Sequence, residues 1–283
     1  MTMNNFDFFS VYNSDEKSSD VKKQMKDFFN DQNGITKKTK QLDSIKKILT
    51  YPPSWKPCNL DNLPPYSMYL QFTFTLAKPY ISKDDDSIYF TDNPIKKEKV
   101  FRVPYIASSS WKGNMRWVAS KDAQSQDKDI IVTRLFGNNK EIKNDFRRGR
   151  LHFYPTFFDT IGIEMINPHD REKGIGTIPV TIESVPAGTI GAFSLLYVPF
   201  DIIDQEYSAI KAEATEDIKL IFSALENMFL TYGFSAKKSS GYGIIADELT
   251  DCHVNIKGET TLSKPAKTFK ELSNYISEIR KQL

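Results

Sequence analysis

A long amphipathic helix in the C-terminal third of the sequence limits the possible folds more than any other feature. Its apolar residues recur at helical spacing, and they are Ile210, Ala214, Ile218, Ile221, Phe222, Leu225, Met228 and Phe229. A helix with one apolar face must bury that face against another element. Because the segments before and after it have strand character, we expect this helix to pack on a β-sheet.

Strand character appears on both sides of the helix. The alternation in SMYLQFTFTLAKPYI, from Ser67, is typical of a half-buried strand, and RRGRLHFYPTFFD, from Arg147, reads as a strand entered through a basic turn. Two further β-segments flank the turn at residues 186–188, and IIADELTDCHVNI, from Ile244, provides the last one. The chain therefore contains strands both before and after its longest helix.

The remaining segments complete an alternating order of elements. We expect a helix from Ser108 to about Ser120 with one of its three serines as N-cap, a short helix or strand that ends at Gly137, and a helical tail at Lys270–Arg280. The order β, α, β, β, β, α, β predicts an α+β fold with a ferredoxin-like, antiparallel sheet.

The first 65 residues differ in character from the rest of the chain. They are polar and rich in Lys, with helices expected near Ser19–Asn30 and Lys40–Tyr51. The proline-rich stretch YPPSWKPCNLDNLPPYS follows, and prolines at this density stop both helices and strands. We therefore predict a helical lead-in and connector at residues 1–65 and the main domain, with its helical tail, at residues 66–283.

The charge of the chain is unevenly distributed. Its formal net charge is +2, yet residues 93–150 hold 14 Lys and Arg against 6 Asp and Glu, a local charge of +8. Such asymmetry indicates a basic face for a polyanion, with a solvated charged surface as the alternative.

Several classes of protein are disfavoured by what the sequence lacks. No apolar run approaches the roughly 20 residues that a membrane span needs, and the N-terminus lacks the pattern of a secretion signal. We therefore expect a cytoplasmic protein without a membrane partner. Cys58 and Cys252 lie far apart and form no CxxC, so two reduced structural thiols are expected.

Two stretches combine small polar residues, glycine and cations. VPYIASSSWKGNMRW, residues 103–117, places hydroxyls where a strand gives way to a helix, and helix N-termini of this kind bind phosphate through free backbone N–H groups. GFSAKKSSGYG, residues 233–243, has glycines that permit close backbone approach, two lysines and a tyrosine. Neither stretch has the spacing of a Walker loop.

These motifs and their order resemble a known family. FTDNPIKKEKVFRVPYIASSSWKGNMR, then LFG, GRLHFYPTFFD, INPHDREKGIGTIPVTIESVPAGTIGAFSLLYV and GFSAKKSSGYG are similar to motifs of the RAMP (repeat-associated mysterious protein) superfamily of type III CRISPR effector complexes. The resemblance covers about Met68–Leu249. INPHD before the strand pair is similar to the Cmr (III-B) branch, in particular its subunit near the 3′ end of the guide RNA.

The resemblance implies a fold, partners and a set of contact residues. It implies an RRM-like core with helices on one face and insertions, which binds CRISPR RNA and target RNA and stacks with other RAMP subunits. Backbone amides and cations fix a protein on RNA without reading its sequence. Carried over by motif, the RNA-binding residues are Ser108, Ser109, Ser110, Lys112, Arg116, Gly233, Ala236, Lys237, Lys238, Ser239, Gly241 and Tyr242.

Asp92 leaves an alternative function open. In target-cleaving RAMP members an aspartate precedes the serine motif, and TDNPI lies at a similar place, although the double glycine often seen before it is missing. A carboxylate there holds Mg²⁺, so Mg²⁺ is expected only if Asp92 is catalytic; otherwise neither a cofactor nor a metal site is expected.

Three functions therefore compete. The first is an RNA-binding structural subunit of the effector complex in antiviral defence. The second is a metal-dependent endoribonuclease that cleaves target RNA through Asp92, or precursor RNA through a basic and histidine site. A nucleotide-binding enzyme ranks last, because SSSWKG lacks the glycine spacing of a phosphate loop. Structural roles are expected for His152, His169 and His253.

Overall fold

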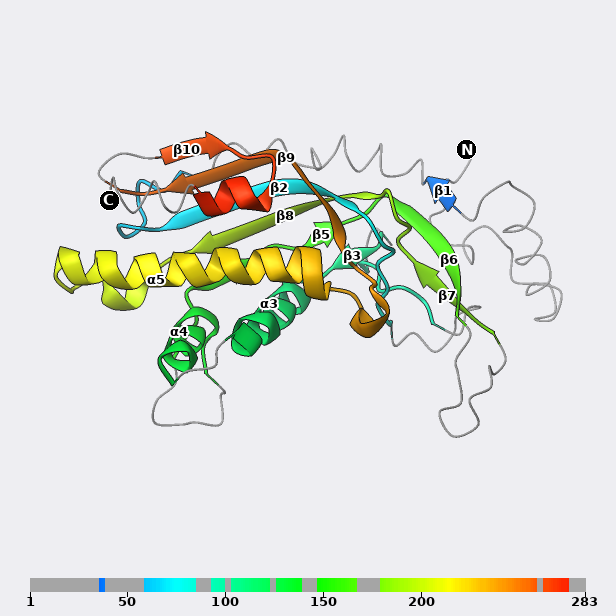
Figure 1. Cartoon of the computed structure of the whole chain (residues 1–283), viewed down its shortest axis with the longest axis horizontal. Coiled ribbons are helices and arrows are strands. Elements are labelled where there is room, and N and C mark those ends of the chain that lie inside the picture. Colours follow the sequence, from blue (N-terminus) through cyan, green and yellow to red (C-terminus); the bar gives the residue numbers. More distant parts are fainter. Residues whose placement is uncertain are drawn as a thin grey trace.

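A five-stranded antiparallel sheet forms the centre of the protein (Figure 1). The computed structural model describes residues 36–38, 59–84, 93–99, 103–122, 126–138, 147–166, 179–258 and 262–274. Its central strands are β2 (Met68–Leu76), β4 (Leu151–Phe153), β8 (Ile190–Tyr197), β9 (Ile245–Ile256) and β10 (Leu262–Pro265). They lie in the order β10-β9-β2-β8-β4.

The strand order matches the expected topology. Without the edge strand β10, four strands remain: the fourth along the chain, β9, pairs with the first, β2; β2 pairs with the third, β8; and β8 pairs with the second, β4. Helices connect the first strand to the second and the third to the fourth, which gives the βαββαβ order of ferredoxin-like folds. The register places Met68 opposite both Tyr197 and Ile256. The predicted α+β fold with an antiparallel sheet is therefore confirmed.

Three helices lie on one side of this sheet (Figure 1). They are α3 (Ser108–Asp122), α4 (Gln126–Phe136) and α5 (Tyr207–Glu226), and α5 continues as a π-helical segment, η3 (Asn227–Tyr232). The helix expected from Ser108 is confirmed, and the segment before Gly137 is a helix rather than a strand. Residues 269–274 are helical, whereas the rest of the expected tail and both expected N-terminal helices lie outside the described residues.

Aromatic side chains fill the space between the sheet and the helices. Phe229 of η3 lies 5.2 Å from Phe72 of β2 and 5.4 Å from Trp111 of α3, measured between ring centroids. All three side chains are fully or almost fully buried. Trp111 also donates a hydrogen bond from Nε1 to Thr156 Oγ1 at 3.1 Å. Because aromatic pairs add about 0.5–1.5 kcal/mol each beyond their buried area, this cluster fixes α3 firmly on the sheet.

Smaller sheets surround the central one. β1 (Thr36–Lys38), β6 (Thr160–Ile166) and β7 (Val180–Ser184) form a three-stranded sheet, and β3 (Tyr105–Ile106) pairs with β5 (Thr156–Phe157). The single strand expected from Arg147 is wrong, because it consists of the separate strands β4 and β5. Pro155 lies between them and has no N–H to donate to a continuous ladder.

Candidate nucleic-acid interface

The helix α3 begins directly after the short strand β3. The carbonyl of Ala107 accepts hydrogen bonds from the N–H groups of Ser110 at 2.9 Å and Trp111 at 3.1 Å. Ala107 is therefore the N-cap, and the expected serine N-cap is wrong: β3 pairs as far as Ile106, so the chain enters the helix one residue early. The first turn contains no acidic residue that would neutralise the positive end of the helix.

Two cations of α3 lie on one face of the helix, as their spacing of four residues requires. Lys112 is half-buried and Arg116 is exposed. Burial lowers the pKa of Lys112, and the positive charge of Arg116 lowers it further. The two charges therefore lie close enough to repel each other, and an anion bound between them would offset that repulsion.

The glycine-rich segment is a tightly closed loop after η3. Gly233 and Gly243 have φ values of 73°, and a Cβ on Gly233 would lie 2.5 Å from the Tyr242 carbonyl oxygen. A Cβ on Gly243 would lie 2.5 Å from the Ser235 Cβ. The N–H of Phe234 donates to the carbonyl of Gly243 at 3.1 Å, which closes the loop. Glycine is required at both positions, because a side chain would collide with the opposite arm.

The tip of the loop presents polar and cationic side chains to solvent. Ala236, Lys237 and Ser239 are exposed, and a short 3₁₀ turn, η4, spans Lys238–Ser240. Lys237 has a φ of 56°, a left-handed conformation that a non-glycine residue adopts only when its surroundings enforce it. Gly241, with a φ of 79°, ends this turn in open space.

Tyr242 lies at the base of the loop and is half-buried. Burial raises the pKa of its hydroxyl, and the negative charge of Glu164 on β6 raises it further. Tyr242 therefore stays protonated at neutral pH and remains able to donate a hydrogen bond.

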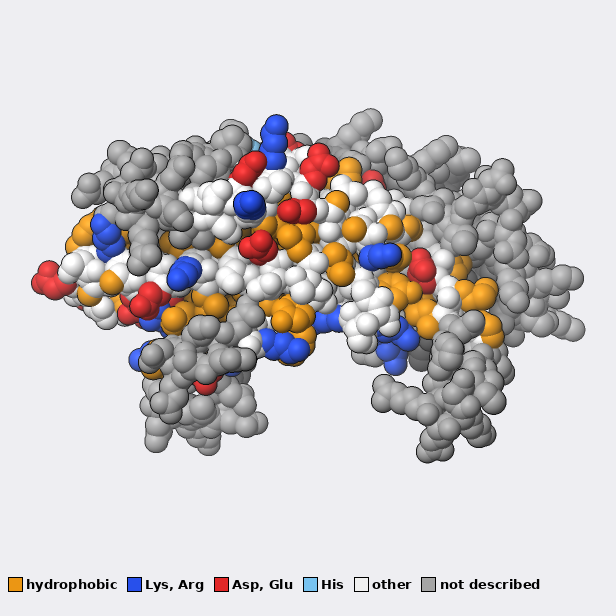
Figure 2. All heavy atoms as spheres, in the orientation of Figure 1, with side chains coloured by type: hydrophobic (Ala, Val, Ile, Leu, Met, Phe, Trp, Pro, Cys, Tyr) orange, Lys and Arg blue, Asp and Glu red, His pale blue; other side chains and the backbone are white. Residues whose placement is uncertain are grey.

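The structure brings the serine motif and the glycine-rich loop together. Asn114 Nδ2 donates to the carbonyl of Ser110 at 2.9 Å and to that of Phe234, 120 residues away, at 3.2 Å. The rings of Trp111 and Phe234 lie 4.7 Å apart. Figure 2 shows Lys and Arg side chains at the lower edge of this face, where α3 and the loop lie in Figure 1. We name the surface that they form the α3–loop surface: its exposed residues are Ser109, Arg116, Ala236, Lys237 and Ser239, and its half-buried residues are Lys112 and Lys238.

The loop is held in place by the segment that follows β2. Gly243 N–H donates to Pro79 O at 2.8 Å, and Ala236 N–H donates to Ile81 O at 2.9 Å. The Ser235 hydroxyl accepts from Ile81 N–H at 2.7 Å and donates to Ile81 O at 2.9 Å. These bonds fix the position of the loop relative to the central sheet.

A histidine for which the sequence predicts a structural role lies near Lys112 of this surface. His152, expected to be structural, points to solvent from β4 between the buried side chains of Leu151 and Phe153. Burial lowers its pKa, and the positive charges of Lys112 and Arg148 lower it further. His152 also lines a cavity of about 550 Å³ together with Arg147 and Arg148. The alternation of strand β4 indicates this outward position, although it does not identify the neighbouring cations.

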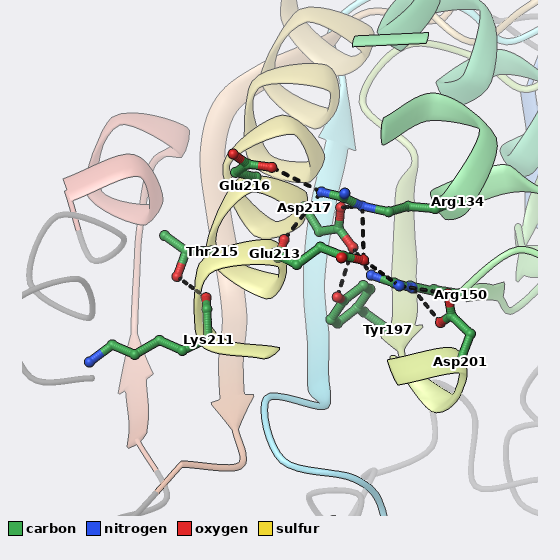
Figure 3. A network of polar contacts seen from close by, with 9 residues as sticks. All are labelled: Arg134, Arg150, Tyr197, Asp201, Lys211, Glu213, Thr215, Glu216 and Asp217. Atoms are coloured by element: carbon green, nitrogen blue, oxygen red, sulfur yellow. Dashed lines mark hydrogen bonds and ion pairs between the residues drawn. The ribbon is translucent and has the colours of Figure 1, made fainter. Parts of the chain in front are cut away.

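Two arginines of the basic segment are turned inward and neutralised (Figure 3). The fully buried carboxylate of Asp217 accepts hydrogen bonds from Arg134 Nε at 2.5 Å, Arg150 Nη1 at 2.8 Å and the Tyr197 hydroxyl at 2.8 Å. Arg150 also forms two bonds of 2.6 Å to Asp201. This network joins α4, β8, α5 and the residue that precedes β4, and carboxylates already neutralise its two arginines.

A third cation of that segment is also internal. Lys97 Nζ lies 3.0 Å from Glu183 Oε2, and both side chains are buried. The local charge of +8 therefore overstates the exposed positive charge. What remains at the surface includes Lys112, Arg116 and the arginines at 147 and 148.

The remaining residues that the sequence singled out lie away from this surface or outside the described residues. Asp92 and residues 167–170 of the INPHD motif, which include His169, are outside the described residues. His253 is exposed on β9, and Cys252 is buried, which raises the pKa of its thiol to about 12. Within the described ranges, no three His, Cys, Asp or Glu side chains lie together as metal ligands, and no helix is long and apolar enough to cross a bilayer.

The fold and this surface define an α+β protein of ferredoxin-like topology, with a basic helix start and a glycine-rich loop side by side. A sequence model described as the RAMP superfamily matches residues 79–246, and the chain belongs to this superfamily. The match spans both motifs of the α3–loop surface and confirms the resemblance on which the residues were assigned.

Individual relatives come from type III CRISPR systems. The chain is 31% identical over 175 residues to a protein of Streptococcus thermophilus named CRISPR system Cms endoribonuclease Csm3, covering 56% of this chain and 74% of that protein. It is similar to a chain of the type III-B Cmr-beta complex bound to cognate target RNA, with 18% identity, 87% and 79% coverage and a TM-score of 0.47. It is also similar to a chain of the type III-A Csm3–Csm4 subcomplex, with 13% identity and a TM-score of 0.48. That match covers 76% of this chain and 97% of the other. The subunit position near the 3′ end of the guide stays a prediction.

Proposed function

We propose that this chain is an RNA-binding structural subunit of a type III RNA-guided effector complex, and that its α3–loop surface holds the backbone of the CRISPR RNA. The observation that carries the proposal is the contact between two basic, hydroxyl-rich motifs that lie 120 residues apart in sequence. Membership of the RAMP superfamily and the names of the relatives support it.

The geometry suits backbone binding without base recognition. The start of α3 offers free N–H groups and a positive dipole end, and Lys112 and Arg116 add charge on the adjoining face. The tip of the loop adds Lys237, Lys238 and the Ser239 hydroxyl, which are suited to phosphates and 2′-hydroxyls. RNA held in this way leaves its bases free to pair with a target.

The proposed partners of this chain are CRISPR RNA, target RNA and other RAMP subunits. The chain works as a cytoplasmic component that lies beside other RAMP subunits along the CRISPR RNA, with target RNA pairing to that guide. A chain of the Cmr-beta complex, solved with target RNA, and one of the Csm3–Csm4 subcomplex are among the similar structures.

Salt-dependent RNA binding tests the proposal. The full chain is titrated with single-stranded oligouridylate at several salt concentrations, and the slope of log affinity against log salt is compared with that of the double variant Lys112→Glu, Arg116→Glu. Each phosphate contact contributes about −0.7 to the slope for single strands, so loss of the phosphate between these two cations should lower the affinity and remove about 0.7 of the slope.

A matched control uses two exposed lysines that follow the edge strand β10, as Lys267→Glu and Lys270→Glu. This control should retain the wild-type slope, and circular dichroism should show that both double variants are folded. Equal losses in the two variants would reject the assignment of RNA binding to the α3–loop surface. Absence of RNA binding by the full chain, alone and assembled, would reject the function.

A second candidate function is a metal-dependent endoribonuclease that acts through Asp92. The observation that favours it is the name of the Streptococcus thermophilus relative, which is called an endoribonuclease. A carboxylate at residue 92 would supply one ligand to Mg²⁺, and the ion would stabilise charge that develops in the transition state.

A further inference from the structure

Trp117 lies on α3 beside the glycine-rich loop and is 40% exposed. The ammonium groups of Lys121 and Lys238 each lie 4.4 Å from the centroid of its ring, one from α3 and one from η4. The ring of Tyr232 meets Trp117 edge-on at 5.4 Å, and Lys121 Nζ lies 5.3 Å from the Tyr232 centroid. The motif-based prediction includes Lys238 but neither Trp117 nor Lys121.

Trp117, Lys121 and Lys238 form a cluster with a net positive charge. Each ammonium group is attracted by the ring electrons, but the two groups repel each other. Burial lowers the pKa of Lys238, and the charge of Lys121 lowers it further. Among the residues whose side chains the structure describes, no carboxylate lies within ion-pair distance of either lysine. The cluster therefore has a positive charge that an anion can neutralise.

We propose that Trp117, Lys121 and Lys238 bind one nucleotide of single-stranded RNA: a phosphate draws the two ammonium groups off the indole ring, and the base stacks on the ring face that they leave. The inference rests on the proposed function and adds to it a stacking position that the motifs do not contain. An indole stacks on any of the four bases, so the site is tolerant of sequence.

The position of the cluster suits a strand that is already bound to the α3–loop surface. Lys238 belongs to both, and Gly113, one helical turn before Trp117, has no atom within 4 Å of the place where a Cβ would lie. The exposed arc of α3 therefore carries Lys112 and Arg116 on one side, an open strip at Gly113, and Trp117 on the other. A nucleic-acid chain that crosses this strip meets the indole and both ammonium groups.

Tryptophan fluorescence tests the stacking directly. Of the three tryptophans, Trp111 is fully buried, so in a Trp55→Phe background solvent-exposed emission comes from Trp117. Titration of this full-length variant with oligouridylate should quench that emission with the same midpoint as an independent binding measurement. Added Trp117→Phe should remove the quenching and leave RNA binding largely intact.

The RNA affinities of variants measure how much Trp117 and the two lysines contribute to binding. Trp117→Ala should weaken oligouridylate binding about five- to 150-fold, the range for loss of one stacked base, whereas Trp117→Phe should change it only slightly. Lys121→Gln with Lys238→Gln should reduce the salt slope by about 0.7, as expected for one phosphate. Phe200→Ala, which removes an aromatic ring exposed elsewhere, and Lys270→Gln serve as matched controls.

The outcomes separate this inference from the proposed function. RNA binding with unchanged Trp117 emission, and with wild-type affinity in Trp117→Ala, overturns the stacking site and leaves the function standing. Emission that responds to another protein subunit but not to RNA also overturns it, because Trp117 then lies at a protein interface. Absence of RNA binding by the full chain, alone and assembled, overturns both.

Discussion

Among single residues, the positive charges around Lys112 lower the pKa of their neighbours. His152 lies near Lys112 and Arg148, and after burial these two cations are what lowers its pKa below the ordinary value of 6.5. A phosphate bound at Lys112 would cancel part of that positive charge. The pKa of His152 should therefore change when an anion binds at Lys112.

RNA binding should raise the pKa of His152. The bound state then holds more protons than the free state below that raised value, so the affinity should increase as the pH falls through it and lose this dependence well above 6.5. NMR titration of the histidine ring protons, with and without oligouridylate, measures the shift, and His253 on β9 is the internal control. A pKa that stays constant or falls on RNA binding would contradict the placement of a phosphate at Lys112.

Asp217 is the residue on which the buried network depends. Asp217→Asn should lower the free energy of unfolding by about 3–5 kcal/mol, because it leaves Arg134 and Arg150 buried with less compensating charge. Glu216→Gln is the matched control: its side chain is 63% exposed, so the loss should be below about 1 kcal/mol. Urea unfolding of both variants gives the comparison, and similar effects would show that the network is not the source of the stability.

At the scale of elements, α3 has a structural weakness at its exposed centre. Gly113 is a helix-interior residue, and a side chain at this position would meet nothing within 4 Å. Glycine lowers helix stability relative to alanine by about 0.5–1 kcal/mol. Nothing in the packing of α3 requires glycine here, and we predict that RNA approaches the backbone at this point.

Gly113→Ala should therefore change stability and binding in opposite directions. The free energy of unfolding should increase by about 0.5–1 kcal/mol, while the affinity for oligouridylate should decrease because the new methyl group stands in the path of the strand. Thermal unfolding and RNA titration of the same preparation measure both quantities. An increase in stability with unchanged affinity would show that RNA does not approach the backbone at this point.

The elements with strong periodicity could be predicted from the sequence. All eight apolar residues that defined the long helix are buried, because a 3.6-residue repeat has one structural solution. The strand β10 could not be predicted, since Ser263, Lys264 and Pro265 show no alternation and pair on one side only. The π-helical segment η3 could not be predicted either, because local spacing does not distinguish it from the α-helix that it continues.

The candidate site could be predicted only in part. Small hydroxyls, glycines and cations in a short stretch identify α3 and the loop one at a time. Their contact through Asn114 and Phe234, and the approach of Lys238 to Trp117, are products of tertiary packing. The inward position of Arg134 could not be predicted either, since a count of charges does not distinguish a cation paired with a buried carboxylate from a free one.

At the scale of the whole molecule, the question is whether the assembled complex cleaves RNA through this chain. We predict that Asp92→Ala leaves every cut in complementary target RNA unchanged, because TDNPI lacks the double glycine that precedes the aspartate in cleaving members. Guide RNA should remain bound, since a carboxylate does not hold phosphate directly. Labelled target RNA with native and variant complexes decides this, and loss of one Mg²⁺-dependent product would establish the endoribonuclease alternative.

The register of the central sheet also determines when this chain can fold during its synthesis. β2 is the first core strand to leave the ribosome, but its partner Ile256 is made roughly 190 residues after Met68. At about 5–20 residues per second, this delay is on the order of 10 to 40 seconds. One edge of β2 can pair as soon as β8 is made, but the edge that pairs with β9 stays open throughout that time, and an unpaired strand edge favours aggregation. The central sheet therefore becomes complete only after β9 and β10 have been translated, long after β2.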